Sequence, residues 1–252
     1  MDKTAFLARV REAAQAGRAF RVTHGDELDT PLRLAPATTG DLPARLAAEV
    51  EAVGGRAHLA SDWADAAGQL AQLLDRYQPQ TALCWQGGAL DALRLNELLD
   101  QRNVRRVDYD ALHRLEPAEQ RRQILAADIG ITGVTAAVAE TGSLVMASGT
   151  GHERVASLAP PVHVAVVAVN QIIADLFDVF PGVEQGGHRA EEGGASGMTS
   201  SAHLARLGPG QMPSNLALIT GPSKTGDLEL KLTTGVHGPG EWHVMIVCMP
   251  LL

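Results

Sequence analysis

The sequence predicts an α/β fold built around a largely parallel β-sheet, and three observations lead to that prediction. In the first half of the chain, strand-length apolar runs alternate with segments whose apolar residues recur at helical spacing. In the second half, the run "VHVAVVAV" (162–169) is almost continuously apolar, which is typical of a strand buried on both faces. Aromatic residues make up only 4% of the chain, so we expect an aliphatic core.

Helices and strands alternate between residues 42 and 127. The first helical pattern ends at Gly54 and Gly55, the second begins at a capping Ser61 or Asp62, and Pro117 suits the first turn of the last. The expected helices are 42–55, 61–77, 90–100 and 117–127, and the expected strands are 56–60, 81–85 and 104–109.

The second half is richer in β-strand patterns. The stretch 131–151, "ITGVTAAVAETGSLVMASGTG", predicts short strands between tight glycine turns. The segment 170–180, "NQIIADLFDVF", has the pattern of a helix that stops at Pro181. Three further strands are expected at 215–220, 228–233 and 242–247.

No linker clearly divides the chain, so we expect one domain over residues 1–252. An amphipathic helix at 4–16 predicts that residues 1–40 form an N-terminal helical extension. Residues 182–197 hold six glycines and almost no apolar side chains, which predicts a flexible surface loop.

Composition argues against several classes of protein. The net charge is −8, and the arginines between 102 and 122 are interleaved with acidic residues, so nucleic-acid binding is not expected. No apolar segment reaches the length of a membrane span, and the N-terminus has no apolar signal-peptide centre, which predicts a cytoplasmic protein.

The cysteines and histidines do not suggest a metal site. Cys84 and Cys248 each lie in an apolar run, so we expect both to be buried strand residues. Two cysteines without a CxxC pair cannot hold an iron–sulfur cluster, and the nine histidines lack compact zinc-ligand spacing. We therefore expect no metal and no cofactor bound by this chain.

The stretch "LALITGPSKTGDLEL" (216–230) has some features of a phosphate-binding P-loop but fails its spacing. A P-loop needs glycine directly before the lysine and again five residues earlier. Ser223 and Leu218 occupy those positions, and the strand-like "DLELKLT" follows instead of a helix. What remains is a polar turn, which suits either an anion site or a connection between strands.

Three glycine turns carry the candidate chemistry. They could converge on one edge of the sheet, where α/β folds bind ligands, and the sequence leaves open whether they do. Glu140 suits a general acid–base or nucleophilic role if it is partly buried, or a structural bond to turn amides. His237 suits proton donation, ligand contact or a structural hydrogen bond. The other candidate ligand-binding residues are Thr141, Gly142, Ser143, Ser148, Gly149, Thr150, Arg154, Ser223, Lys224, Thr225 and Asp227.

These turns also carry a family resemblance. "GITGVTAAVAETGSLVMASGTGHERVASLAPPVHVAVV" and "ITGPSKTGDLELKLTTGVHGPGEWHVMIV" together resemble the LUD (lactate utilisation) domain family, and most closely its small members, over about residues 125–250. The resemblance implies a three-layer α/β/α fold like that of the ribose-5-phosphate isomerase, glucosamine-phosphate deaminase and CoA-transferase group. It also implies a part in oxidising L-lactate to pyruvate beside two iron–sulfur partner proteins.

Two functions follow from this resemblance. The first is a non-redox accessory or ligand-binding subunit, with the iron–sulfur clusters on partner subunits and a small anion in the turns. The alternative is a stand-alone enzyme acting on a phosphosugar or an acyl-CoA, with Glu140 as base or nucleophile. The sequence leaves open whether this chain catalyses a reaction itself.

Overall fold

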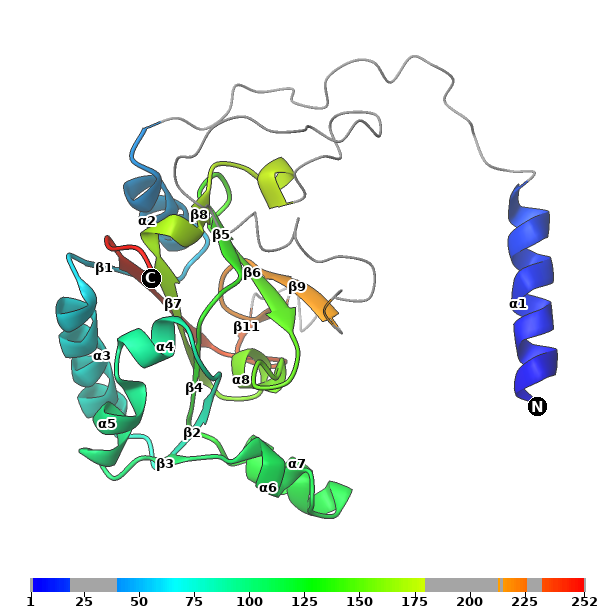
Figure 1. Cartoon of the computed structure of the whole chain (residues 1–252), viewed down its shortest axis with the longest axis horizontal. Coiled ribbons are helices and arrows are strands. Elements are labelled where there is room, and N and C mark those ends of the chain that lie inside the picture. Colours follow the sequence, from blue (N-terminus) through cyan, green and yellow to red (C-terminus); the bar gives the residue numbers. More distant parts are fainter. Residues whose placement is uncertain (1, 19–39, 180–212, 214, 226–232, 252) are drawn as a thin grey trace. The chain divides into compact units, whose positions relative to one another are not determined.

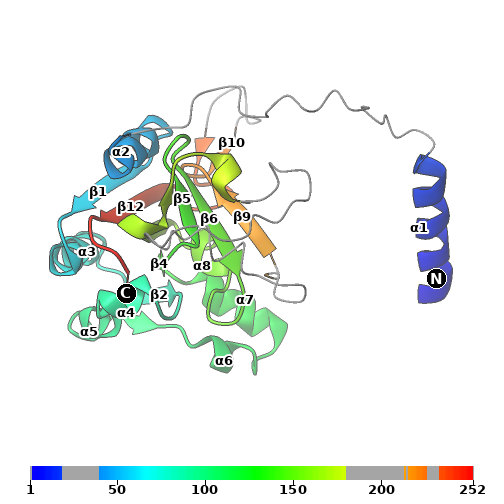
Figure 2. The same cartoon turned by 45° about the horizontal axis from the view of Figure 1, so that its top comes forward.

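The computed structural model describes residues 2–18, 40–179, 213, 215–225 and 233–251. The chain divides into two compact units, residues 1–36 and 37–252. The first contains helix α1 (Lys3–Arg18), which confirms the helix expected at 4–16, and the side chains of Phe6 and Leu7 on it are exposed. All other elements belong to the second unit (Figures 1 and 2).

A six-stranded, entirely parallel sheet forms the centre of the second unit, which confirms the predicted fold class (Figure 1). Every residue of β7 (162–168) is buried, as its continuous apolar run predicts. In spatial order the strands are β1 (Arg56–Ala60), β12 (Glu241–Val247), β7 (Val162–Ala168), β4 (Ile129–Thr132), β2 (Thr81–Cys84) and β3 (Arg105–Arg106).

Helices cover both faces of this sheet, so the three-layer arrangement is confirmed. Successive residues of a strand point to opposite faces. Trp242 lies on the face of α2 (Leu42–Ala52), beside Gly55, and its neighbour His243 meets Tyr77 at the end of α3 (Trp63–Tyr77). On the Trp242 face, α8 (Val155–Leu158) packs against β4.

Local side-chain bonds set several boundaries. Asp62 caps α3 by accepting a hydrogen bond from the Asp65 amide at 2.8 Å. The helix expected at 90–100 is instead two short ones, α4 (Ala89–Ala92) and α5 (Leu95–Asp100), because Arg94 between them is left-handed, with φ of 54°. The strand expected at 104–109 is cut short because Asp108 caps α6 (Tyr109–Leu112), and α7 (Pro117–Leu125) begins at its proline.

A smaller second sheet has the order β8–β5–β6–β9. It consists of β5 (Ala136–Val138), β6 (Ser143–Ser148), β8 (Ile172–Ile173) and β9 (Asn215–Ile219). The helix expected at 170–180 is wrong: β8 and the 3₁₀ turns η2 (Val169–Gln171) and η3 (Leu176–Val179) occupy the segment. Burial of Ile172 and Ile173 against β5 outweighs the helical pattern.

The two cysteines differ in burial. Cys84 is buried as expected, but Cys248 is exposed because it follows the last residue of β12. A two-stranded ribbon joins β10 (Lys224–Thr225) and β11 (Thr233–Thr234). The expected loop at 182–197, Asp227, and most of the expected strand 228–233 lie outside the described residues.

Candidate functional site

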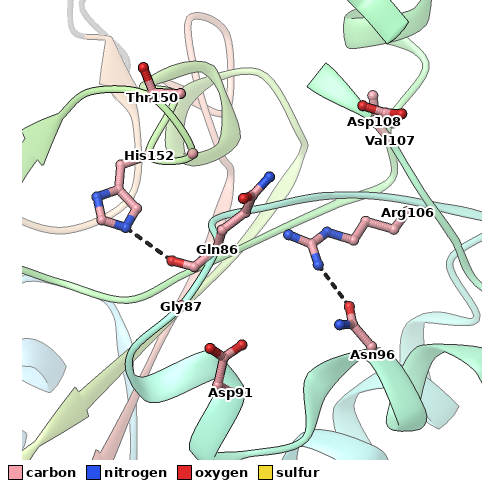
Figure 3. A pocket seen from close by; sticks show the side chains of 10 residues that line it. Gln86, Gly87, Asp91, Asn96, Arg106, Val107, Asp108, Thr150 and His152 are labelled. Carbon is pink, nitrogen blue, oxygen red and sulfur yellow. Dashed lines mark hydrogen bonds between the residues drawn. The ribbon is translucent and has the colours of Figure 1, made fainter. Parts of the chain in front are cut away.

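A polar cleft of about 710 Å³ opens at the carboxyl ends of β2 and β3 (Figure 3). The chain leaves β2 into Gln86 and Gly87, and leaves β3 into Val107 and Asp108. The backbone amide of Gln86 donates a 2.9 Å hydrogen bond to the carbonyl of Gly151, which brings the turn after β6 to the cleft. The lining residues are Gln86, Gly87, Asp91, Asn96, Arg106, Val107, Asp108, Thr150, Gly151 and His152.

The cleft lies beside the point where the strand order reverses. After β2 the next strand of this sheet is β3, on one side, whereas after β4 it is β7, on the other. The connections from these two neighbouring strands therefore diverge. In open α/β sheets, such a crevice at the carboxyl ends of the strands is where ligands bind. The topology therefore favours this cleft as the functional site.

Arg106 supplies the positive charge of the cleft. Its Nη1 donates to Asn96 Oδ1 at 2.7 Å and its Nη2 donates to the Trp85 carbonyl at 3.0 Å, so the partly buried guanidinium is held in place (Figure 3). Both acceptors are neutral, and within the described part of the chain no ion pair joins Arg106 to a carboxylate. Its charge and its remaining N–H groups are available to an anion.

His152 has its protonation pattern set by its neighbours. Its Nε2 lies 3.0 Å from the Gln86 carbonyl oxygen, which can only accept, so Nε2 carries the proton. In the neutral ring Nδ1 is then a hydrogen-bond acceptor. The ring lies against the indole of Trp85 at 4.7 Å between centroids, and Trp85 Nε1 donates to the Glu153 carbonyl at 3.1 Å. His152 therefore offers a fixed acceptor.

Burial raises the pKa of two groups close to the cleft. Burial raises the pKa of the Cys84 thiol to about 12, and burial is also the main cause that raises the pKa of Tyr109. At neutral pH Cys84 is therefore a thiol with little nucleophilic character, and it acts as part of the core.

The predicted site residues fall into two groups at opposite ends of β6. Those of the turn after β6 lie at clefts: Thr150 lines the cleft of Arg106. Ser148, Gly149 and Arg154 line a second cleft of about 680 Å³, which also includes Asn215. Among the described residues the turns therefore do not all converge on one site.

The turns before β6 and after β9 meet each other instead. Ser143 Oγ lies 2.7 Å from Thr220 Oγ1 and accepts from Thr141 Oγ1 at 2.8 Å. A side chain at Gly142, where φ is 67°, would place its Cβ 2.8 Å from the Glu49 backbone of α2. The first half of the motif pair thus packs against the C-terminal end of α2.

Lys224 completes this packing. Its Nζ donates to the carbonyl of Val53, the residue that caps α2, so its charge faces the negative end of the helix dipole. Replacing Lys224 with glutamine is expected to lower the free energy of unfolding by about 0.5–1 kcal/mol. Urea denaturation measures this effect, and Lys224→Arg, which keeps the charge, should lose less. Equal stability of all three proteins would contradict the capping role.

The remaining candidates line neither cleft. Glu140 and His237 are exposed, and the Glu140 amide donates to the Ala174 carbonyl at 3.1 Å. The partial burial on which an acid–base or nucleophilic role of Glu140 depended is therefore not found. Ser223 makes backbone bonds to Pro239 and Gly235, and Thr225 pairs with Thr233 in the β-ribbon. Ligand binding by these residues stays a prediction.

Six polar residues that line the Arg106 cleft are not among the site residues predicted from the sequence. They are Gln86, Asp91, Asn96, Arg106, Asp108 and His152. A signal existed for Gln86, because it follows the end of the expected strand 81–85, where parallel sheets bind ligands. Arg106 lies inside the expected strand 104–109, and only the structure shows that the strand ends there. Among the described residues no group of three His, Cys, Asp or Glu side chains could hold a metal ion, and no helix is long and apolar enough to span a membrane.

The chain matches a known protein family over most of its length. The family model of the LUD domain matches residues 44–247, which include both strands that form the cleft. The chain belongs to the LUD domain family.

The chain is also similar to lactate utilization proteins of several bacteria. The chain is 30% identical over 168 residues to lactate utilization protein C of Halalkalibacterium halodurans, covering 66% of this chain and 62% of that protein. It is 28% identical to the protein of the same name from Shouchella clausii, covering 68% and 63%. It is also 29% identical to lactate utilization protein B of Bacillus subtilis, covering 60% of this chain and 26% of that one. This LUD domain chain thus spans less than two thirds of these relatives.

A solved structure is also similar to this chain. A crystal structure of a DUF162 family protein from Deinococcus radiodurans matches with a TM-score of 0.48 and 19% identity, covering 82% of this chain and 96% of that one.

Proposed function

We propose that this LUD domain chain serves lactate utilisation as a non-redox, ligand-binding subunit. Its Arg106 cleft binds the carboxylate of a small organic acid such as lactate or pyruvate. Two iron–sulfur subunits transfer the electrons when L-lactate is oxidised to pyruvate. The protein acts in the cytoplasm.

The observation that carries this proposal is the guanidinium of Arg106. It lies in a cleft at the strand-order reversal, held by two neutral acceptors, Asn96 Oδ1 and the Trp85 carbonyl. A guanidinium held in this way is preorganised for a carboxylate. The names of the relatives, lactate utilization proteins C and B, support lactate chemistry as the process.

Binding of L-lactate and pyruvate to the purified protein, measured by isothermal titration calorimetry, tests the site. Arg106→Gln should weaken binding at least about tenfold, because hydrogen bonds from a charged group are lost. Arg105→Gln is the matched control, since Arg105 is the preceding residue of β3, bonds to Thr81 and does not line the cleft. Equal binding by both variants would refute the site.

Growth on L-lactate tests the process. A strain without the gene should grow poorly on lactate, and the Arg105→Gln gene should restore growth while the Arg106→Gln gene does not. Normal growth of the deletion strain would refute the role in lactate utilisation. Affinity purification of the tagged full chain from lactate-grown cells should recover two iron–sulfur proteins, and their absence would refute the proposed partners.

The alternative of a stand-alone phosphosugar or acyl-CoA enzyme depended on Glu140 as the reacting group. The side chain of Glu140 is exposed and lines neither cleft, so the geometry does not favour that function.

A further inference from the structure

We propose that the Arg106 cleft binds polyhydroxylated monocarboxylates, such as a six-carbon sugar acid, more tightly than it binds lactate. This inference rests on the proposed function in one respect, that the cleft at the ends of β2 and β3 is the ligand site. It goes beyond that function by naming the class of acid that the cleft fits.

The first argument is size. The cleft has a volume of about 710 Å³. Cavities of about 300–1,000 Å³ bury drug-sized ligands. Lactate has about six non-hydrogen atoms, so even at the roughly 30 Å³ that a water molecule occupies in the liquid, it would fill about a quarter of this space. A ligand with twice as many atoms uses the cleft better.

The second argument is the hydrogen-bonding capacity that remains beside Arg106. The exposed carboxylate of Asp91 has no hydrogen bond to any described residue, and the Nδ1 of His152 is an acceptor once Nε2 is bonded to the Gln86 carbonyl. Asn96 accepts from Arg106 with its oxygen, which leaves its NH₂ group to donate. In Figure 3 Asp91 and Arg106 point toward the Gln86–Gly87 segment from different sides.

Hydroxyl groups match this set because each of them both donates and accepts. Lactate offers one hydroxyl group, whereas a sugar acid offers several at different distances from its carboxylate. A ligand whose carboxylate is on Arg106 can therefore reach Asp91 and His152 only if it carries further hydroxyl groups along its chain. A longer hydroxylated ligand therefore gains hydrogen bonds to acceptors of the cleft that otherwise face water.

The third argument is charge, which separates a carboxylate from a phosphate. The cleft contains one arginine and two aspartates, Asp91 and Asp108, which together carry a formal charge of −1. Asp108 is committed to capping α6, where it accepts from the Asp110 and Ala111 amides. Both aspartates repel a phosphate dianion about twice as strongly as a carboxylate monoanion, because its charge is twice as large. The hydroxyl groups of a sugar acid can in addition donate to Asp91.

Calorimetric titration of the full chain with D-gluconate, L-lactate, D-glucose 6-phosphate and D-glucose tests the inference. We expect gluconate to bind at least tenfold more tightly than lactate and glucose 6-phosphate, and glucose to bind most weakly. Asp91→Asn should lower the ratio of gluconate affinity to lactate affinity about tenfold. Asp110→Asn, an exposed aspartate on α6 that does not line the cleft, is the matched control and should leave both affinities unchanged.

The outcomes separate this inference from the proposed function. Lactate binding that depends on Arg106 without a preference for gluconate would overturn the inference and leave the proposed function standing. Gluconate binding that Arg106→Gln does not weaken would place the ligand elsewhere and overturn both. Tighter binding of glucose 6-phosphate than of gluconate would overturn the charge argument and with it the assigned class.

Discussion

Replacing Gly130 with alanine is expected to lower the free energy of unfolding by about 3 kcal/mol or more. Gly130 is buried in the middle of β4, and an added Cβ would lie 1.8 Å from the carbonyl oxygen of Ala156 in α8. Neither backbone can yield without moving α8 away from the sheet. Residues 149–154, which separate the two clefts, lead directly into α8, so lactate binding should weaken as well.

Urea denaturation of the Gly130→Ala protein beside Gly133→Ala tests this expectation. Gly133 follows the same strand, but an added Cβ there meets no heavy atom within 4 Å, so its replacement should change stability by about 0.5 kcal/mol or less. Equal effects at the two positions would show that α8 does not lie against β4 as described.

Acidification from pH 7 to pH 5 should destabilise the protein strongly. Burial is the main cause that lowers the pKa of His163 to about 3 and that of His243 to about 4. An unfolded histidine has a pKa near 6.5, so below that pH the unfolded chain binds protons that the folded one does not. Stability therefore decreases as the pH falls below about 6.5, with a slope that approaches about 1.4 kcal/mol per pH unit for each of the two histidines, or about 2 kcal/mol each between pH 7 and pH 5.

The surroundings of these histidines explain the shifts. His163 is fully buried and meets Thr132 Oγ1 at 2.9 Å. His243 lies between His58 and the hydroxyl of Tyr77, each at 2.9 Å, and Tyr77 also donates to Glu241. Burial lowers the pKa of His58 as well, which adds to the same trend. All three rings remain neutral in the folded protein at pH 7.

Unfolding free energies measured in urea at pH 7, 6 and 5 test this prediction. His163→Gln should lower by about one the number of protons that the unfolded chain binds in excess of the folded chain. The slope of the unfolding free energy against pH should therefore decrease by about 1.4 kcal/mol per pH unit at the acidic end of this range. His113→Gln, an exposed histidine after α6, is the control and should keep the wild-type slope. If the variant folds poorly, the NMR signal of His163 in the wild type serves instead and should not titrate above pH 4. A slope of zero between pH 7 and 5 would contradict the assignment.

The elements that the sequence predicted well are those with a strong local signal. The strand at 56–60 and the buried strand from Val162 appear where their patterns place them, and Pro117 begins its helix. The helix expected at 170–180 does not form because Ile172 and Ile173 pair with β5. No local sequence pattern indicates that these two residues pair with a strand distant in the chain. The expected helix at 90–100 failed at the left-handed Arg94.

The two halves of the motif pair show a similar division. The sequence places a polar glycine turn at Gly142 and another at Gly221, and the structure brings them together through Ser143 and Thr220. There Lys224 caps α2. The chemistry of a lysine in a polar turn suggests an anion contact, but a helix end that lies 171 residues away in the chain supplies the contact instead.

The sequence by itself determined the class of fold, the burial of its central strands and the family, because periodicity and a long motif are properties of neighbouring residues. Only the tertiary structure decided where the site lies. The cleft joins Gln86, Arg106 and His152, which stand on three separate segments. Gln86 and Arg106 meet because parallel strands carry their carboxyl ends to one edge of the sheet, whereas the turn that holds His152 follows β6 of the second sheet and is held there by the bond from the Gln86 backbone amide to Gly151. Which residues meet there follows from the spatial order of the strands, and that order is set by packing between distant parts of the chain.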